Sequence, residues 1–133
     1  MENCIFCAIA EKKISANLVL ENETCLAFLD NNPVSPYHTL VIPKVHYENM
    51  FDIPKAVLME VTETIHQVCL LYAEKLGLDS IQIFNNSGPH TAQTVYHLHF
   101  HILPRFEKDA IRFEVNIRRD LVEKFPEMLT RLK

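Results

Sequence analysis

The sequence predicts an α+β domain in which an antiparallel sheet of about five strands packs with one long helix and a C-terminal helix. Three observations lead to this class. Five short apolar runs have the length of strands, and most of them follow one another along the chain. One longer segment has the periodicity of an amphipathic helix. The length of 133 residues fits a single domain, which we assign to residues 1–133.

The N-terminal part contains three of the predicted strands. Residues 4–12 are predicted to form a short helical turn. Residues 18–20 and 24–28 are apolar runs joined by a polar stretch, which is typical of a hairpin. Residues 31–36 are rich in asparagine and proline and are predicted to be a loop. The third strand covers residues 38–43 and ends at a proline.

The remaining elements follow in order. A helix is predicted over residues 54–76, with Gly77 as its C-terminal cap. Its apolar stripe consists of Val57, Leu58, Val61, Ile65, Val68, Tyr72 and Leu76. Residues 80–84 and 95–103 are predicted strands, separated by a polar loop. The tail from about 117 to 132 has helical spacing, and its internal proline predicts a break or a late start.

Composition excludes several classes of protein. The net charge is −4 and no run of Lys or Arg exceeds two residues, so we expect no nucleic-acid partner. Gly77 and Gly88 are the only glycines, which argues against a Rossmann motif or a P-loop. No apolar stretch approaches the ~20 residues of a membrane span, and no signal-peptide pattern is present. We therefore expect a cytoplasmic protein whose four cysteines are thiols or metal ligands.

The strongest motif is a row of histidines that alternates with apolar residues over 97–103. Successive side chains of a strand point to opposite faces, so His97, His99 and His101 are predicted to share one face. Three imidazoles carry six ring nitrogens that need partners, which favours a functional role over a structural one. Two chemistries fit this row. One is a zinc site, and the other is attack of a neutral imidazole on phosphorus with a second histidine managing the proton.

A second motif is the Cys-x-x-Cys pair formed by Cys4 and Cys7. Such a pair forms half of a tetrahedral zinc site or a redox dithiol. A thioredoxin-like dithiol follows a strand, whereas this pair begins the chain. His46, just beyond the strand 38–43, is a candidate third ligand, which favours structural zinc. Cys25 and Cys69 lie in apolar runs and are predicted to be small buried residues.

The chain resembles the histidine triad (HIT) family, whose signature His-φ-His-φ-His-φ-φ is matched by residues 97–103. The resemblance extends to Cys4-Ile5-Phe6-Cys7, Phe28-Leu29-Asp30, residues 38–44 and Leu103-Pro104-Arg105, and it fades after about Asp109. It implies a HIT-like fold with an N-terminal zinc segment, residues 1–12. The resemblance is weaker over the C-terminal tail, residues 109–133, for which it still implies a C-terminal helix.

The resemblance also implies an activity. His99 is expected to attack the α-phosphorus of a nucleotide derivative, and water then hydrolyses the covalent adduct. His101 and His38 are expected to flank it as a proton and hydrogen-bond relay. Histidine at position 101 points away from the uridylyltransferase branch and toward hydrolases. Adenosine phosphoramidates, diadenosine polyphosphates and related mononucleotides all remain candidate substrates.

Further residues follow from the same resemblance. The expected contacts to the nucleotide, beside His99 and His101, are Asp30 on the ribose and Asn86, Gln93 and Thr94 on the phosphate and leaving group. His97 is implied as the fourth zinc ligand, beside Cys4, Cys7 and His46. The zinc is expected to be structural, and a homodimer is expected because relatives join their sheets.

Two positions depart from the family pattern. Family members usually have glycine at the position of Ala92 and often at Tyr37. Alanine can keep the backbone further from phosphate, and His90 is a candidate compensating donor. Two alternatives stay open. His97, His99 and His101 could hold a catalytic zinc, or the protein could be a nucleotide-sensing or partner-binding module with little turnover.

Overall fold

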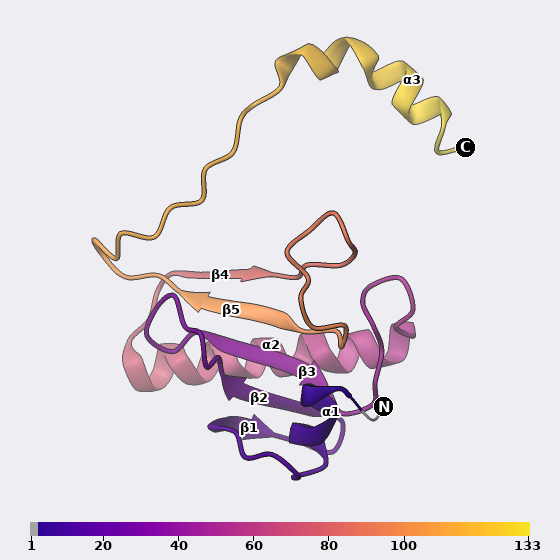
Figure 1. Ribbon diagram of the computed structural model, residues 1–133. Helices are drawn as coiled ribbons and strands as arrows, with labels where there is room; N and C mark the ends of the chain where they lie inside the picture. Colours follow the sequence, from indigo (N-terminus) through magenta and orange to yellow (C-terminus); the bar gives the residue numbers. More distant parts are fainter. Residues whose placement is uncertain (1–2) are drawn as a thin grey trace.

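The computed structural model describes residues 3–133 and contains one five-stranded antiparallel sheet (Figure 1). The strands are β1 (Leu18–Glu21), β2 (Cys25–Leu29), β3 (Thr39–Pro43), β4 (Ile81–Phe84) and β5 (Phe100–Pro104), in the order β1-β2-β3-β5-β4. The helices are α1 (Ile5–Ala10), α2 (Lys55–Leu76), the 3₁₀ helix η1 (Arg119–Lys124) and α3 (Phe125–Thr130). This confirms the predicted α+β class. Met1 and Glu2 of the predicted zinc segment lie outside the described residues.

Helix α2 covers one face of the sheet. Pro54 stands at its N-cap, and Gly77 ends it in the left-handed conformation (φ 68°). There the N–H of Gly77 donates to the carbonyl of Ala73, and the N–H of Leu78 donates to the carbonyl of Tyr72. A stripe of side chains at helical spacing packs against β2 and β3, as the periodicity predicts. Its buried members are Val61, Thr64, Ile65, Val68 and Tyr72.

Alternation along the strands gives the sheet two different apolar faces. On β2, Cys25 and Ala27 belong to the core under α2, whereas Leu26 and Phe28 belong to the cluster formed with α1. Helix α1 supplies Phe6 to that second cluster. The face opposite α2 is covered by α1 only in part, which leaves room for a cleft.

One row of side chains crosses the sheet on the α1 face. Phe28 pairs with Leu40, Leu40 pairs with His101, and His101 pairs with Phe84 in the antiparallel register. Directly opposed residues project to the same side of a sheet. The four side chains therefore form a continuous row on this face of the sheet, and His101 is one of them.

The fifth strand is shorter than the sequence predicts. It begins at Phe100, so His97 and His99 precede it, and the single strand predicted over 95–103 is wrong in its first half. The ladder stops beside Pro43, which has no N–H to offer. Instead the N–H of Leu98 donates to the carbonyl of Tyr47 at 2.7 Å. The alternation still buries Leu98 and Ile102 completely in the core under α2.

The C-terminal arm, which we define as residues 112–133, extends away from the sheet (Figure 1). Its helical part, with Pro126 in the first turn of α3, agrees with the prediction of a helical tail that starts late. No residue of η1 or α3 is buried. The arm exposes eight large apolar side chains: Phe113, Val115, Ile117, Val122, Phe125, Met128, Leu129 and Leu132. No helix of residues 3–133 is long and apolar enough to span a membrane.

Candidate active site and metal centre

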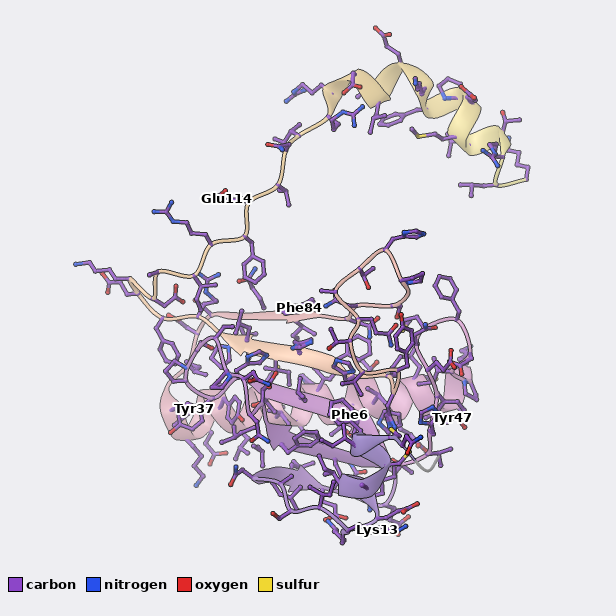
Figure 2. The ribbon with its side chains drawn as sticks, in the orientation of Figure 1. Phe6, Lys13, Tyr37, Tyr47, Phe84 and Glu114 are labelled. Carbon is purple, nitrogen blue, oxygen red and sulfur yellow. The ribbon has the colours of Figure 1, made fainter. Side chains whose placement is uncertain are left out.

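A cleft of about 390 Å³ lies on the α1 face of the sheet. Its polar side contains five of the residues implied by the resemblance, namely Asp30, Asn86, Thr94, His99 and His101. Its apolar side is formed by Ile5, Phe6, Ile9, Phe28 and Leu40. Phe6 lies on α1, and Phe84 lies on β4 at the upper edge of the sheet (Figure 2). A ligand with one flat apolar part and one polar, charged part fits these surroundings.

The ring of His99 is held in one tautomer by the backbone. Its Nδ1 lies 2.8 Å from the carbonyl oxygen of His97. A carbonyl only accepts, so Nδ1 carries the hydrogen and Nε2 keeps its lone pair. Burial lowers the pKa of His99, which keeps the ring neutral. Phe6 packs edge-on against this ring with centroids 5.1 Å apart, and Asn85 donates to the His99 carbonyl at 2.9 Å.

His38 and His101 form a directed pair behind His99. The N–H of Val34 donates to Nδ1 of His38 at 3.2 Å, so the hydrogen of this ring lies on Nε2. Nε2 of His38 is 2.9 Å from Nδ1 of His101 and 3.4 Å from Oδ2 of Asp30. His101 therefore accepts through Nδ1 and carries its own hydrogen on Nε2.

Both rings of this pair stay neutral near pH 7. Burial, reinforced by the neighbouring His99 and His38, lowers the pKa of His101 to about 4. Burial also lowers the pKa of His38, although Asp30 opposes the shift. The neutral pair is thus a chain of N–H donors that ends at Nε2 of His101.

Cys4, Cys7, His46 and His97 come together beyond the end of β3 and the start of β5, with their ligand atoms within 4.8 Å of one another. Nδ1 of His97 lies 3.3 Å from Sγ of Cys4 and 3.5 Å from Sγ of Cys7. Nδ1 of His46 lies 3.4 Å from Sγ of Cys7. A tetrahedral zinc ion separates its sulfur and nitrogen ligands by about 3.5 Å. The four residues that the sequence and the resemblance named together therefore fit a structural metal centre.

The chemistry of these four side chains also fits a cation. Nε2 of His97 lies 2.7 Å from the carbonyl of Pro43, so it carries the hydrogen and Nδ1 turns its lone pair toward the two sulfurs. Burial, followed by the neighbouring sulfur of Cys4, raises the pKa of Cys7 to about 11. Two adjacent thiolates need a cation to be stable here, because like charges in a buried place repel.

A second group of metal-binding side chains is better explained as a hydrogen-bond chain. Asp30, His38 and His101 also have ligand atoms within 4.8 Å of one another. However, Val34 holds the hydrogen of His38 on Nε2, the nitrogen that a metal would need. A metal held by His97, His99 and His101 is not supported either within residues 3–133. His97 turns toward the cysteines, and Nδ1 of His99 binds a carbonyl.

Besides His38, which contacts His101, two residues named from the sequence do not line the cleft. Gln93 is buried and accepts hydrogen bonds from Gly88 N–H and Asn49, and it donates to the carbonyls of Glu48 and Val95. Its side chain therefore braces the loop and does not line the cleft, and its expected contact with phosphate stays a prediction. His90 is exposed and does not line the cleft.

The two positions that depart from the family pattern behave differently. Ala92 lines the cleft and has no positive φ, so its backbone does not require glycine. Tyr37, in contrast, adopts the left-handed conformation with φ 63°, where a bulky residue is strained. Its ring packs on Tyr72 of α2 with centroids 5.6 Å apart, away from the cleft.

The sequence did not single out four residues that shape the site: Phe6, Val34, Phe84 and Asn85. Each contacts a site histidine by ring packing or by a hydrogen bond, and Phe6 and Phe84 also line the cleft. The chemical type of these residues does not predict such contacts from the sequence. Phe84 becomes the partner of His101 only through the register of the sheet.

Known proteins are similar to this chain in both sequence and fold. The HIT domain family matches residues 11–108. An uncharacterized HIT-like protein of Methanocaldococcus jannaschii is 44% identical over 107 residues, which cover 80% of this chain and 82% of the relative. An adenylylsulfatase, HINT3, of Arabidopsis thaliana is 32% identical over 117 residues, which cover 88% of this chain and 59% of that protein.

Two solved structures extend the comparison. A HIT family protein of Bacillus anthracis superposes with a TM-score of 0.88 at 29% identity, covering 98% of this chain and 95% of that one. A Zn-bound histidine triad family protein of Mycobacterium smegmatis superposes with a TM-score of 0.79 at 30% identity, covering 99% of both chains. The histidine row, the cleft beside it and these likenesses lead to one conclusion: the chain belongs to the histidine triad (HIT) family.

Proposed function

We propose that this protein hydrolyses a nucleoside phosphate derivative at its α-phosphorus through a covalent nucleotidyl-His99 intermediate. The observation that carries the proposal is the lone pair on Nε2 of His99, which the His97 carbonyl fixes at the wall of the cleft. A neutral, oriented imidazole is a competent nucleophile toward phosphorus. The adenylylsulfatase relative acts on a substrate of this class.

The first step forms a bond from Nε2 of His99 to phosphorus and breaks the bond to the leaving group. His99 becomes a cation, and its Nδ1–H bond to the His97 carbonyl strengthens as the charge develops. Nε2–H of His101 donates to the leaving atom and stabilises the negative charge that collects there. In the second step water attacks phosphorus and displaces His99. Over both steps the hydroxyl of water ends on phosphorus and its proton on the leaving group.

The lining of the cleft supports a nucleotide as the substrate. Phe6 and Phe28 offer flat apolar surface to a base. Asp30 is 15% exposed in its side chain and can accept hydrogen bonds from ribose hydroxyls. Asn86 and Thr94 line the same cleft as the histidines and can donate to phosphate. Ala92 has no positive φ, so its backbone conformation does not require glycine, and a sensing module with little turnover is the alternative that the adduct experiment below tests.

We assign zinc to the Cys4, Cys7, His46 and His97 group, where it would supply structural stability only. His97 is the connecting residue. Its side chain faces the two sulfurs, while its backbone carbonyl orients His99. A metal that fixes His97 therefore also fixes the direction of the nucleophile. The Zn-bound histidine triad protein of Mycobacterium smegmatis supports this choice of metal.

We further propose that two copies of the chain form a homodimer and that the arm of each copy docks on the other. The exposed apolar side chains of the arm need a covering surface. The arm carries six Lys or Arg and four Asp or Glu, a net charge of +2, whereas residues 1–111 carry seven and thirteen, a net charge of −6. These opposite charges favour docking of the arm on a second body.

The covalent step predicts an adduct of one adenylyl group per active chain. Intact-protein mass spectrometry after a brief acid quench with an adenosine phosphoramidate should detect it in the wild type and not in His99→Ala. We expect kcat of His99→Ala to fall by about a thousand-fold or more. His66→Ala, which changes an exposed histidine of α2, should behave as the wild type. Product without adduct at every quench time would contradict the mechanism, and binding without product would favour a sensor.

The metal assignment predicts about one zinc ion per chain in the purified protein. Cys4→Ser should lose most of this zinc and unfold at a lower temperature, because one of the four ligand atoms is removed. Cys69→Ser is the matched control, since this cysteine lies in α2 outside the cluster. Elemental analysis on both variants gives the metal content. Equal zinc in both variants would overturn the assignment.

The arm proposal predicts a mass in solution of about twice the chain mass of 15.4 kDa. Leu129→Gln should shift the equilibrium toward the monomer, because it places a polar group among the apolar contacts of the arm. Glu127→Gln introduces the same residue in the same helix α3 and should leave the mass unchanged. Light scattering over a range of concentrations measures both. A wild-type chain that stays monomeric at high concentration would refute the proposal.

A further inference from the structure

Phe84 on β4 lies broadside against His101. The two ring centroids are 4.5 Å apart and the ring planes differ by only 11°. The contact is set by the sheet, because Phe84 and His101 are directly paired across β4 and β5. Of these ring contacts of His101, the one with Phe84 is the most nearly parallel, since the rings of His38 and His99 are inclined to the His101 ring by 43° and 61°.

Only a few contacts restrain the rotation of the His101 ring. Its Nδ1 accepts from His38 at 2.9 Å, which fixes one point of the ring. That hydrogen bond and the covalent Cβ–Cγ bond together limit rotation of the ring, but they still permit its plane to tilt. The flat face of Phe84 removes this freedom, because a turn of the imidazole would drive its edge into the phenyl ring. Phe84 therefore narrows the range of directions in which Nε2–H of His101 can point.

The ring of Phe84 is itself contacted by the base of the arm. Phe113 contacts it edge-on with centroids 6.1 Å apart. The guanidinium of Arg105 lies 5.8 Å from the centre of the Phe113 ring and donates to Asp109 at 2.7 and 2.9 Å and to the Ile111 carbonyl at 2.8 Å. This arrangement folds residues 105–113 back onto the sheet edge and places Phe113 against Phe84.

We propose that Phe84 is a positioning residue that aims the His101 N–H at the leaving group, and that Phe113 at the base of the arm holds Phe84 in place. Phe84 also lines the cleft, so the alternative is that it contacts the nucleotide directly. The two roles differ in their kinetic effect. A positioning role acts on kcat, because the transition state depends on the direction of His101, whereas a binding role acts on KM.

The test compares four variants of the full, zinc-loaded chain with an adenosine phosphoramidate. We expect Phe84→Leu to lower kcat by about 10- to 100-fold with KM changed less than about threefold, because a small misalignment of a reacting group costs that much. Phe84→Tyr, which keeps a flat ring, should restore most of the rate. Phe113→Ala should have an intermediate effect. Ile83→Ala, an exposed neighbour on the same strand, is the matched control.

A second readout needs no turnover, and it separates this inference from the proposed function on which its kinetic part rests. The ring current of a stacked phenyl moves the Cε1–H proton resonance of His101 upfield. That displacement should be present in the wild type and Phe84→Tyr and absent in Phe84→Leu. A rise in KM without loss of kcat, a Phe84→Leu resonance like that of the wild type, or an equal loss of rate in Ile83→Ala would overturn the inference. If the wild type turns over no nucleotide, the proposed function fails and the resonance alone decides the role of Phe84.

Discussion

The site depends on two backbone carbonyl groups that determine which ring nitrogen of His97 and of His99 keeps its lone pair. The Pro43 carbonyl binds Nε2 of His97 and turns its Nδ1 to the cysteines, and the His97 carbonyl binds Nδ1 of His99 and leaves its Nε2 open. An unsatisfied buried carbonyl costs about 1–3 kcal/mol, which biases a tautomer by roughly 5- to 150-fold. The same residue type thus acquires two opposite roles at positions 97 and 99 from its backbone surroundings.

This constraint also explains why the strand stops where it does. If the ladder between β3 and β5 continued past Phe100, the side chains of His97 and His99 would lie in line with His101 on one face. Pro43 has no N–H for that ladder, so its carbonyl is left for a side chain. The chain before Phe100 turns toward Tyr47 instead. His97 is carried to the metal centre, while His99 and His101 remain at the cleft.

The neutral state of the histidines follows from burial. His99 is 7% exposed and His97 is fully buried, and in this surrounding a charged ring is costly. Neutral rings can be arranged in a chain of donors and acceptors, which charged rings cannot. The relay from Val34 through His38 to His101 is such a chain, and every link in it has one donor and one acceptor. Phe84 stacks on the ring of His101 at the end of this chain, and Phe6 packs edge-on against the neighbouring ring of His99.

Much of the fold could be predicted because periodicity records burial. The stripe on α2, the five strands and the late start of the tail helix follow from spacing and from Pro and Gly positions. The metal ligands could be named because Cys-x-x-Cys and the histidine row have few other uses, although His97 needed the family resemblance. Prediction failed where a role depends on a partner distant in sequence. Gln93 was expected to contact phosphate, but in the structure its amide hydrogen-bonds to Glu48 and Asn49 before α2 and to Gly88 and Val95 after β4. Phe84 had no chemical signal, because its importance arises only from its register with His101.

The most direct test of the tautomer assignment is a long-range proton–nitrogen NMR correlation on the zinc-loaded chain with ¹⁵N-labelled histidine at pH 7, where burial keeps the rings neutral. Single substitutions assign the rings. We expect His99 to carry its hydrogen on Nδ1 and to give an unprotonated Nε2 resonance, while His38, His97 and His101 carry theirs on Nε2. A His99 ring with its hydrogen on Nε2, or a ring protonated on both nitrogens, would contradict the claim that the His97 carbonyl prepares the nucleophile.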